Sequence, residues 1–190
     1  MLRTFPRMMQ DYPEAVFNGF DVKRRERFDR IRTRKGMEAY ASLCRRDFAK
    51  SYPLPKSKSP LKTKVTGTLK ADGYEIRKLT FESRPGYLVT ANLYVPVGKG
   101  PFPGAVVPCG HSQNGKAGDT YQCLSMGLAR NGFAVLIYDP IGQGERVEFP
   151  EHPGCVREHI IQAKKLLLCG DEFSAWRAWD GVRALDCLLE

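Results

Sequence analysis

The 190-residue sequence has no run that approaches the roughly 18 apolar residues of a membrane-spanning helix. Its N-terminus also lacks the continuous apolar stretch of a signal peptide, so the default expectation is a cytoplasmic protein that does not interact with a membrane. The six cysteines form no CxxC pair, and their spacing fits neither a zinc site nor a disulfide scaffold. We therefore expect buried free thiols, no metal and no cofactor.

The sequence has little acidic character in its first third. Residues 1–70 hold 18 Lys and Arg against 7 Asp and Glu, whereas residues 71–190 hold 12 against 14. No aromatic residue interleaves the basic run Lys23-Arg24-Arg25, as a binder of single-stranded nucleic acid would require. A solvated basic helix is the favoured interpretation, and no nucleic-acid partner is expected. A non-catalytic interaction module that uses this basic face remains an alternative.

The chain divides into two predicted parts. Residues 1–20 are mixed in character and are expected to be poorly ordered or loosely docked. Residues 22–50 have the pattern of a helix that Gly36 breaks or kinks, and residues 51–60 form a linker rich in Pro, Lys and Ser. The prediction is a basic helical lead-in and linker over residues 1–60, followed by one domain over residues 61–190.

The second part begins with strands and continues as a strand–helix–strand unit. Residues 74–82 and 87–95 form a predicted antiparallel hairpin around Arg84-Pro85-Gly86. Two apolar runs, 105–109 and 133–138, flank a helix that Asp119 is expected to cap and Asn131-Gly132 to end. The apolar face of this helix is predicted to carry Tyr121, Leu124 and Leu128.

Such strands are parallel, so the fold class is α/β, with a mixed, mostly parallel sheet. Ligands of these sheets bind at the carboxyl ends of the strands, from which loops 110–118 and 139–146 leave.

Two further helices are predicted, one over residues 157–169 and one over residues 173–189. Asp171 is expected to cap the last helix, which carries a predicted apolar stripe, namely Trp176, Trp179, Val182, Leu185 and Leu189. A crossover helix needs a following strand to pack beside, and no strand follows residue 190. The expectation is therefore that the sequence is the front part of a longer domain.

Three motifs allow competing interpretations of the site. Residues 110–117, GHSQNGKA, nearly match the phosphate-binding GxxxxGK[ST] loop, but Ala117 supplies no hydroxyl for Mg²⁺. A nucleotide-binding protein with a degenerate phosphate loop is thus a second alternative. Gly142-Gln143-Gly144 matches only two of the three glycines of a dinucleotide fingerprint. Ser125 follows the pattern of a nucleophile elbow incompletely and is predicted to lie inside a helix, so it is rejected as a nucleophile.

Four stretches together resemble the α/β-hydrolase superfamily, and in particular its acetyl-xylan-esterase-like branch. They are KVTGTLKADGYEIRKLTFESRPGYLVTANLYVP, VPCGHSQNGKA, YDPIGQGER and the closing D-x-x-RALD-x-L. The resemblance implies a sheet of the α/β-hydrolase type, truncated before the nucleophile elbow. It also implies a serine, histidine and acid mechanism that deacylates a small-molecule ester or an acylated sugar.

The resemblance also carries expectations for particular residues. It implies that one oxyanion-hole N–H comes from the backbone of Gly110, His111 or Ser112. Gln143 and Arg146 are candidate substrate contacts, with a structural role favoured for Arg146. No serine of the sequence stands in GxSxG, so no triad residue is assigned. The implied partner is the missing C-terminal half of the domain.

Overall fold

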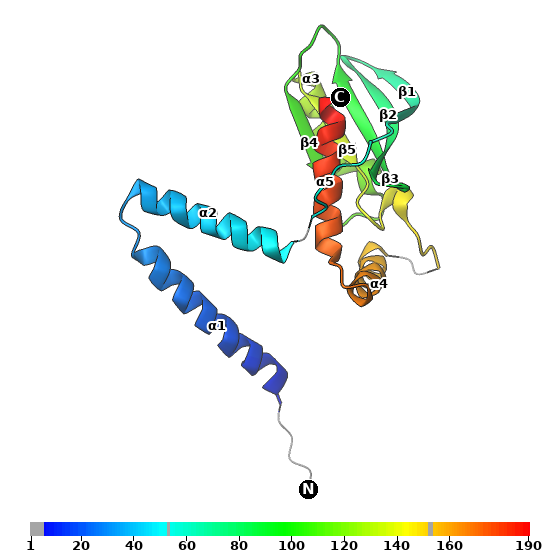
Figure 1. The fold of residues 1–190 in the computed structure, drawn as a ribbon. Helices are drawn as coiled ribbons and strands as arrows, with labels where there is room; N and C mark the ends of the chain where they lie inside the picture. Colours follow the sequence, from blue (N-terminus) through cyan, green and yellow to red (C-terminus); the bar gives the residue numbers. More distant parts are fainter. Residues whose placement is uncertain (1–5, 53, 152–153) are drawn as a thin grey trace. The chain divides into compact units, whose positions relative to one another are not determined.

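The computed structural model describes residues 6–52, 54–151 and 154–190. The chain falls into two units, Met1–Ser51 and Tyr52–Glu190, which are described separately below (Figure 1). Residues 54–60 of the predicted linker belong to the second unit, in which Lys58 Nζ lies 2.6 Å from Asp186 Oδ1. In addition, the carbonyl of Ser59 accepts a hydrogen bond of 2.5 Å from Arg183 Nη2. The segment before the sheet is thereby fixed along the last helix.

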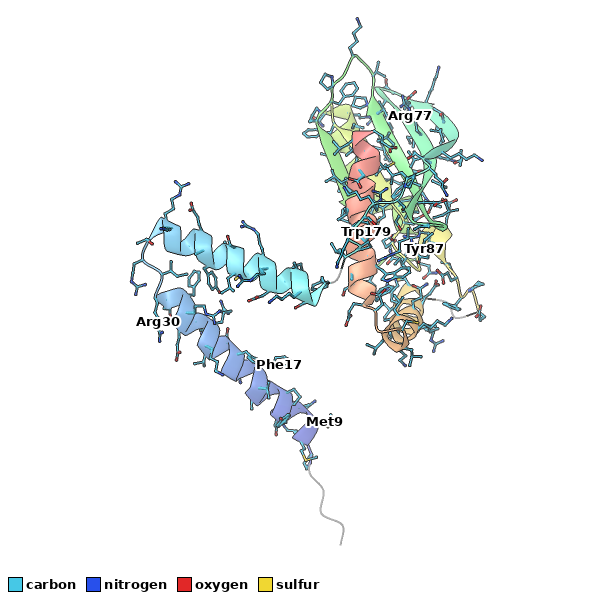
Figure 2. The ribbon with its side chains drawn as sticks, in the orientation of Figure 1. Met9, Phe17, Arg30, Arg77, Tyr87 and Trp179 are labelled. Atoms are coloured by element: carbon cyan, nitrogen blue, oxygen red, sulfur yellow. The ribbon has the colours of Figure 1, made fainter. Side chains whose placement is uncertain are left out.

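The first unit is a pair of helices, α1 (Met8–Asp29) and α2 (Arg34–Ser51), neither of which contains a buried residue. Helix α1 covers most of the segment expected to be poorly ordered or loosely docked, so the expectation of poor order is wrong for its helical residues. The side chains of Met9 and Phe17 on α1 are 82% and 67% exposed (Figure 2). A helix exposed in this way has no buried face, and so no apolar periodicity from which it could be predicted.

The break between the two helices precedes Gly36, contrary to prediction. Gly36 lies in the first turn of α2, and its N–H donates to Thr33 Oγ1 at 3.0 Å. Thr33 therefore satisfies one of the free N–H groups at the start of the helix, as a capping side chain does. Across the break, the rings of Phe28 and Tyr40 meet edge to face, with centroids 5.6 Å apart.

The second unit is built on a five-stranded sheet in the order β1-β2-β3-β5-β4. The strands are β1 (Lys64–Ala71), β2 (Tyr74–Arg84), β3 (Tyr87–Pro96), β4 (Gly104–Pro108) and β5 (Ala134–Tyr138). The predicted hairpin is β2 and β3, and the predicted parallel pair is β4 and β5. The mixed sheet is thus confirmed. The pairings β1–β2, β2–β3 and β3–β5 are all antiparallel. Most of the pairings among the described strands are therefore antiparallel, whereas a mostly parallel sheet was predicted.

Helix α3 (Asp119–Arg130) connects the two parallel strands, as predicted. Its N-cap is Gly118, and Asp119 is the first helical residue, so the predicted cap by Asp119 is wrong. Gln122 instead donates its amide to the carbonyl of Ala117 at 2.7 Å. The buried face of the helix is centred on Ser125 and Ala129, whereas the predicted face residue Leu124 is 49% exposed.

Two apolar clusters cover the opposite faces of the sheet. Leu136 and Tyr138 of β5 pack with residues of α5 (Phe173–Leu189) in one cluster. Val135 and Ile137 lie with Ala129 of α3 in the other. Figure 1 shows α5 and α3 on the two sides of the strands. Because both faces of β5 are covered, its run is continuously apolar, and each fully buried side chain contributes on the order of 1.5–3 kcal/mol.

Helix α4 (Cys155–Leu168) ends before Gly170, whose φ of +73° lies in the left-handed region. Helix α5 has the predicted bounds, but Asp171 does not cap it as expected. Its carboxylate accepts bonds from the Glu172 N–H at 2.9 Å and from Trp176 Nε1 at 2.6 Å.

The buried residues of α5 are Ala175, Trp179, Asp180, Arg183, Ala184 and Cys187. The predicted stripe residues Leu185 and Leu189 are 49% and 76% exposed.

Candidate active site loops

Two loops leave the same end of the parallel strand pair. Pro108, the last residue of β4, pairs with Tyr138, the last residue of β5. The loop that follows β4 contains a short 3-10 turn (Gly115–Ala117), and the loop that follows β5 contains another (Gly144–Arg146). The two predicted site loops therefore begin side by side, at the carboxyl ends where open α/β sheets bind ligands.

Asp139 joins the two loops. Its side chain is fully buried, and its carboxylate accepts hydrogen bonds from Thr90 Oγ1 at 2.6 Å and from the Lys116 N–H at 2.8 Å. It also accepts the Glu145 N–H at 3.3 Å and forms an ion pair with the Lys116 ammonium. One buried carboxylate thus binds backbone groups from both loops, which compensates for its removal from water.

Two glycines make room for this carboxylate. Gly115 and Gly144 have φ of +52° and +57°, in the left-handed region. A Cβ atom built on either residue would collide with the Asp139 carboxylate. Glycine is required at both positions, because only glycine adopts this backbone without cost and lets the two loops approach the same side chain.

Arg146 attaches the second loop to α5. Its guanidinium Nη1 donates to the Asp139 carbonyl at 2.9 Å and to Asp180 Oδ2 at 2.7 Å. Both side chains of the Arg146–Asp180 ion pair are almost completely buried. The guanidinium carbon also lies 5.1 Å from the ring centroid of Tyr87. Through these bonds Arg146 fixes the second loop against α5. Its contact with a substrate stays a prediction.

Gln143 connects the second loop to the first. Its side chain is fully buried, and its Nε2 donates to the carbonyl of Gly110 at 2.8 Å. The N–H of Gly110 donates to Tyr121 Oη at 2.7 Å, so both backbone groups of Gly110 are bound. For Gln143, too, substrate contact stays a prediction, because its described bond is to the protein.

The backbone of His111 and Ser112 is more available. Within residues 6–52, 54–151 and 154–190, the N–H groups of both residues lack a hydrogen-bond acceptor. They directly follow the doubly bound Gly110, at the end of β4. Of the three predicted oxyanion-hole donors, the structure therefore leaves two unbound and one occupied by Tyr121.

His111 has a neighbour that sequence reasoning missed. Its ring centroid lies 5.1 Å from that of His159 on α4, although the two residues are 48 positions apart in the sequence. His159 Nε2 bonds to the carbonyl of Ile141 at 2.7 Å, and burial lowers the pKa of this imidazole. At neutral pH the His159 ring is therefore the uncharged donor to Ile141. No sequence signal joins two single histidines on different elements.

The phosphate-loop interpretation meets a specific obstacle at Lys116. The ammonium group is buried and forms ion pairs with both Asp139 and Glu145. A phosphate-binding lysine must present its charge to the ligand, whereas this charge is already neutralised within the protein. Lys116 is accordingly a buried structural cation.

The structure also explains the incomplete nucleophile pattern at Ser125. Ser125 lies within α3, fully buried, and donates to the carbonyl of Tyr121 at 2.8 Å, as an internal helical serine does. The described part of the chain contains no group of three or more His, Cys, Asp and Glu residues placed to hold a metal ion. None of its helices is long and apolar enough to cross a membrane.

Comparison with known proteins identifies the fold. No family model and no curated protein matches the chain. A solved structure assigned as an acetyl xylan esterase from Bacteroides fragilis is similar over 80% of this chain, with a TM-score of 0.70 and 15% identity. A solved methylesterase, BT1017, is similar over 84% of this chain, with a TM-score of 0.63 and 23% identity. The second unit is therefore built on an α/β-hydrolase type of fold, which confirms the predicted class.

The match covers only part of each of those proteins. This chain spans 43% of the Bacteroides fragilis structure and 34% of the methylesterase. The likeness establishes an esterase-like fold for the matched part of this chain.

Proposed function

We propose that this chain is the front portion of a serine carboxylic-ester hydrolase, in which it supplies the oxyanion-hole loop. The observation that carries the proposal is the pair of unbound N–H groups of His111 and Ser112 at the carboxyl end of β4. Their position corresponds to the loop that stabilises the tetrahedral intermediate in this fold. The solved structures of similar fold, which are described as esterases, support the same reaction class.

The loops contribute to the reaction by being rigid. As a nucleophile attacks an ester carbonyl, the carbonyl oxygen gains negative charge, which fixed N–H donors stabilise without reorganising. Here the first loop is fixed at Gly110 by Tyr121 and Gln143, and at Lys116 by Asp139. Gln143 and Arg146 are thus positioning residues in this proposal.

The remaining machinery lies in the rest of the proposed enzyme. Strand β4 is at the end of the described strand order, so a further strand can pair with its free side. In the proposal, that strand leads to the nucleophilic serine, and the acid and the general-base histidine follow. The substrate is a small ester or an acylated sugar, and no cofactor takes part.

The decisive experiment compares this chain with a longer one that adds the downstream half in the same reading frame. We expect the 190-residue chain to hydrolyse p-nitrophenyl acetate no faster than a heat-denatured control, and the longer chain to turn it over. In the longer chain, Gln143→Leu should lower kcat about tenfold with little change in KM, because it loosens a donor used mainly in the transition state.

Gln10→Leu, on the exposed surface of α1, is the matched control and should change neither constant. Turnover by the 190-residue chain with stoichiometric labelling of a serine would contradict the proposal. So would a longer chain that neither turns over esters nor reacts with a fluorophosphonate.

The interaction-module alternative rests on a different observation. Large apolar side chains of the first unit lie in water beside its basic residues, including Tyr12, Phe17 and Phe20 at 74%, 67% and 64% exposure. Exposed apolar groups of this kind commonly mark interaction surfaces. Deleting residues 1–51 distinguishes the two readings, because esterase turnover by the longer chain should survive the deletion, whereas partner binding by this surface should not.

A further inference from the structure

A pocket lies at the carboxyl ends of the parallel strands β4 and β5, on the face of the sheet that α5 covers (Figure 1). Its volume is about 330 Å³, and its walls are Pro108, Cys109, Tyr138, Pro140, Arg177, Ala178, Asp180 and Gly181. The ends of the two strands supply one side, and α5 supplies the other. Cys109 directly precedes Gly110, so the pocket borders the first site loop, although His111 and Ser112 are not among its walls.

Arg177 brings a positive charge to the wall of this pocket. The residue is partly exposed on α5, and no carboxylate of the described residues forms an ion pair with its guanidinium group. The guanidinium carbon lies 6.0 Å from the ring centroid of Phe173, and this contact occupies none of its N–H donors. Because Arg177 is not fully buried, an anion in the pocket can reach these donors.

The acidic groups around the pocket are already paired with other cations. Asp180, the acidic wall residue, is 1% exposed, and its Oδ2 accepts the Arg146 guanidinium at 2.7 Å. Asp139, which directly follows β5, is paired with the Lys116 ammonium. Since Arg146 neutralises Asp180, the Arg177 charge is the one that a ligand in this pocket meets uncompensated. The electrostatics of the pocket therefore favour an anion.

Tyr138 adds a second donor. Burial raises the pKa of its hydroxyl to about 12, and the Asp180 carboxylate acts in the same direction, so the group keeps its proton at neutral pH. The hydroxyl forms no hydrogen bond with the described part of the chain, and it retains contact with the solvent. It is directed toward α5, because a Cβ atom built on Gly181 would lie 3.2 Å from its oxygen. Arg177 and Gly181 are four residues apart, on one face of the helix, so both donors lie beside the same space.

We infer that this pocket binds the carboxylate group of a short-chain organic acid, such as butyrate. The carboxylate accepts hydrogen bonds from the Arg177 guanidinium and the Tyr138 hydroxyl, and charge-assisted bonds of this kind are roughly twice as strong as neutral ones. Apolar surface for the hydrocarbon chain comes from Pro108, Pro140 and Ala178. A phosphate ion has no such chain and is expected to bind more weakly. The inference concerns binding by this chain itself and does not depend on the proposed esterase activity.

Saturation-transfer NMR of the ligand measures this binding, whether or not the chain associates with itself. We expect a saturable signal from butyrate, and about tenfold weaker binding of butyramide, which has the same shape without the charge. Arg177→Met should weaken butyrate binding about tenfold and leave butyramide binding nearly unchanged, because methionine keeps the apolar contacts and removes the charge. Arg157→Met is the control, since Arg157 is exposed on α4 and is not a wall residue.

A filling variant tests the location independently of the charge. Ala178→Phe places a ring at an exposed part of the wall and should abolish butyrate binding. Ser174→Phe, one turn earlier on α5, should not, since Ser174 is exposed and is not a wall residue. Four results would overturn the inference: a butyrate signal that rises without saturation, equal affinities for butyrate and butyramide in the unaltered chain, equal effects of Arg177→Met and Arg157→Met, or tighter binding of inorganic phosphate than of butyrate.

Discussion

Replacing Asp139 by asparagine tests whether one carboxylate holds the two site loops. Asparagine has nearly the same shape, but it removes the charge opposite Lys116 and one of the acceptor oxygens. Lys116 is 6% exposed, and its remaining ion-pair partner would be Glu145, whose side chain is 70% exposed. Removing one member of a buried ion pair typically costs about 3–5 kcal/mol, because the other charge is left buried.

We therefore expect Asp139→Asn to lower the free energy of unfolding of the second unit by about 3 kcal/mol, at the lower end of the range because Glu145 remains. Urea titration followed by tryptophan fluorescence measures this loss, since both tryptophans lie on α5. Glu75→Gln, in the same unit, is the control. Its ion pair with Arg77 is partly exposed, at 30% and 45%, and should contribute less than about 1 kcal/mol.

A double variant decides the cause. If the loss comes from the uncompensated Lys116 charge, adding Lys116→Met to Asp139→Asn should restore about 1 kcal/mol or more, since the orphaned ammonium is gone. The reasoning would be refuted by a double variant that is less stable than Asp139→Asn alone, or by a single variant that loses less than about 1 kcal/mol.

Three further outcomes follow from the structure. Mg-ATP should not raise the melting temperature, because the Lys116 charge is already paired, whereas true binding would add about 2.7 kcal/mol at a hundredfold excess over Kd. Burial raises the pKa of Cys109 to about 12, so at pH 8 a thiol reagent should label exposed Cys123 quickly and Cys109 only after unfolding; equal rates would be inconsistent with the core. The free side of β4 should make the chain associate with itself, and light scattering from a concentrated sample that remains monomeric and melts in one sharp transition would disprove this.

The strand–helix–strand unit could be predicted because its residues are buried in a regular way. The β5 run is apolar throughout since α3 and α5 cover both of its faces, and this pattern is visible without a structure. Strand β1 was missed for the opposite reason. All of its residues are exposed to solvent except Gly67, which is partly buried. The strand therefore has no alternation of buried and exposed side chains that its sequence could reveal. The charged face of α5 was missed because Asp180 and Arg183 are buried through partners distant in sequence.

The positions of the two candidate site loops could be predicted better than the bonds between them. Loops that follow parallel strands must meet at one edge of the sheet, and this follows from topology alone. The pairing of Lys116 with Asp139 spans 23 residues, and the approach of His111 to His159 joins different elements. Periodicity contains no information on such contacts. Gly115 and Gly144 were the sequence features that could have indicated the close approach of the two loops, since both adopt a backbone conformation that other residues avoid.

The shared carboxylate of Asp139 also has a consequence for motion. The amides of Lys116 and Glu145 are protected from exchange with solvent deuterium by the same side chain, although they lie in different loops. Neither amide can exchange by a fluctuation of its own loop without weakening the bond that steadies the other. The two loops should therefore open together, as a single cooperative unit with one opening free energy, while the rest of the sheet remains closed.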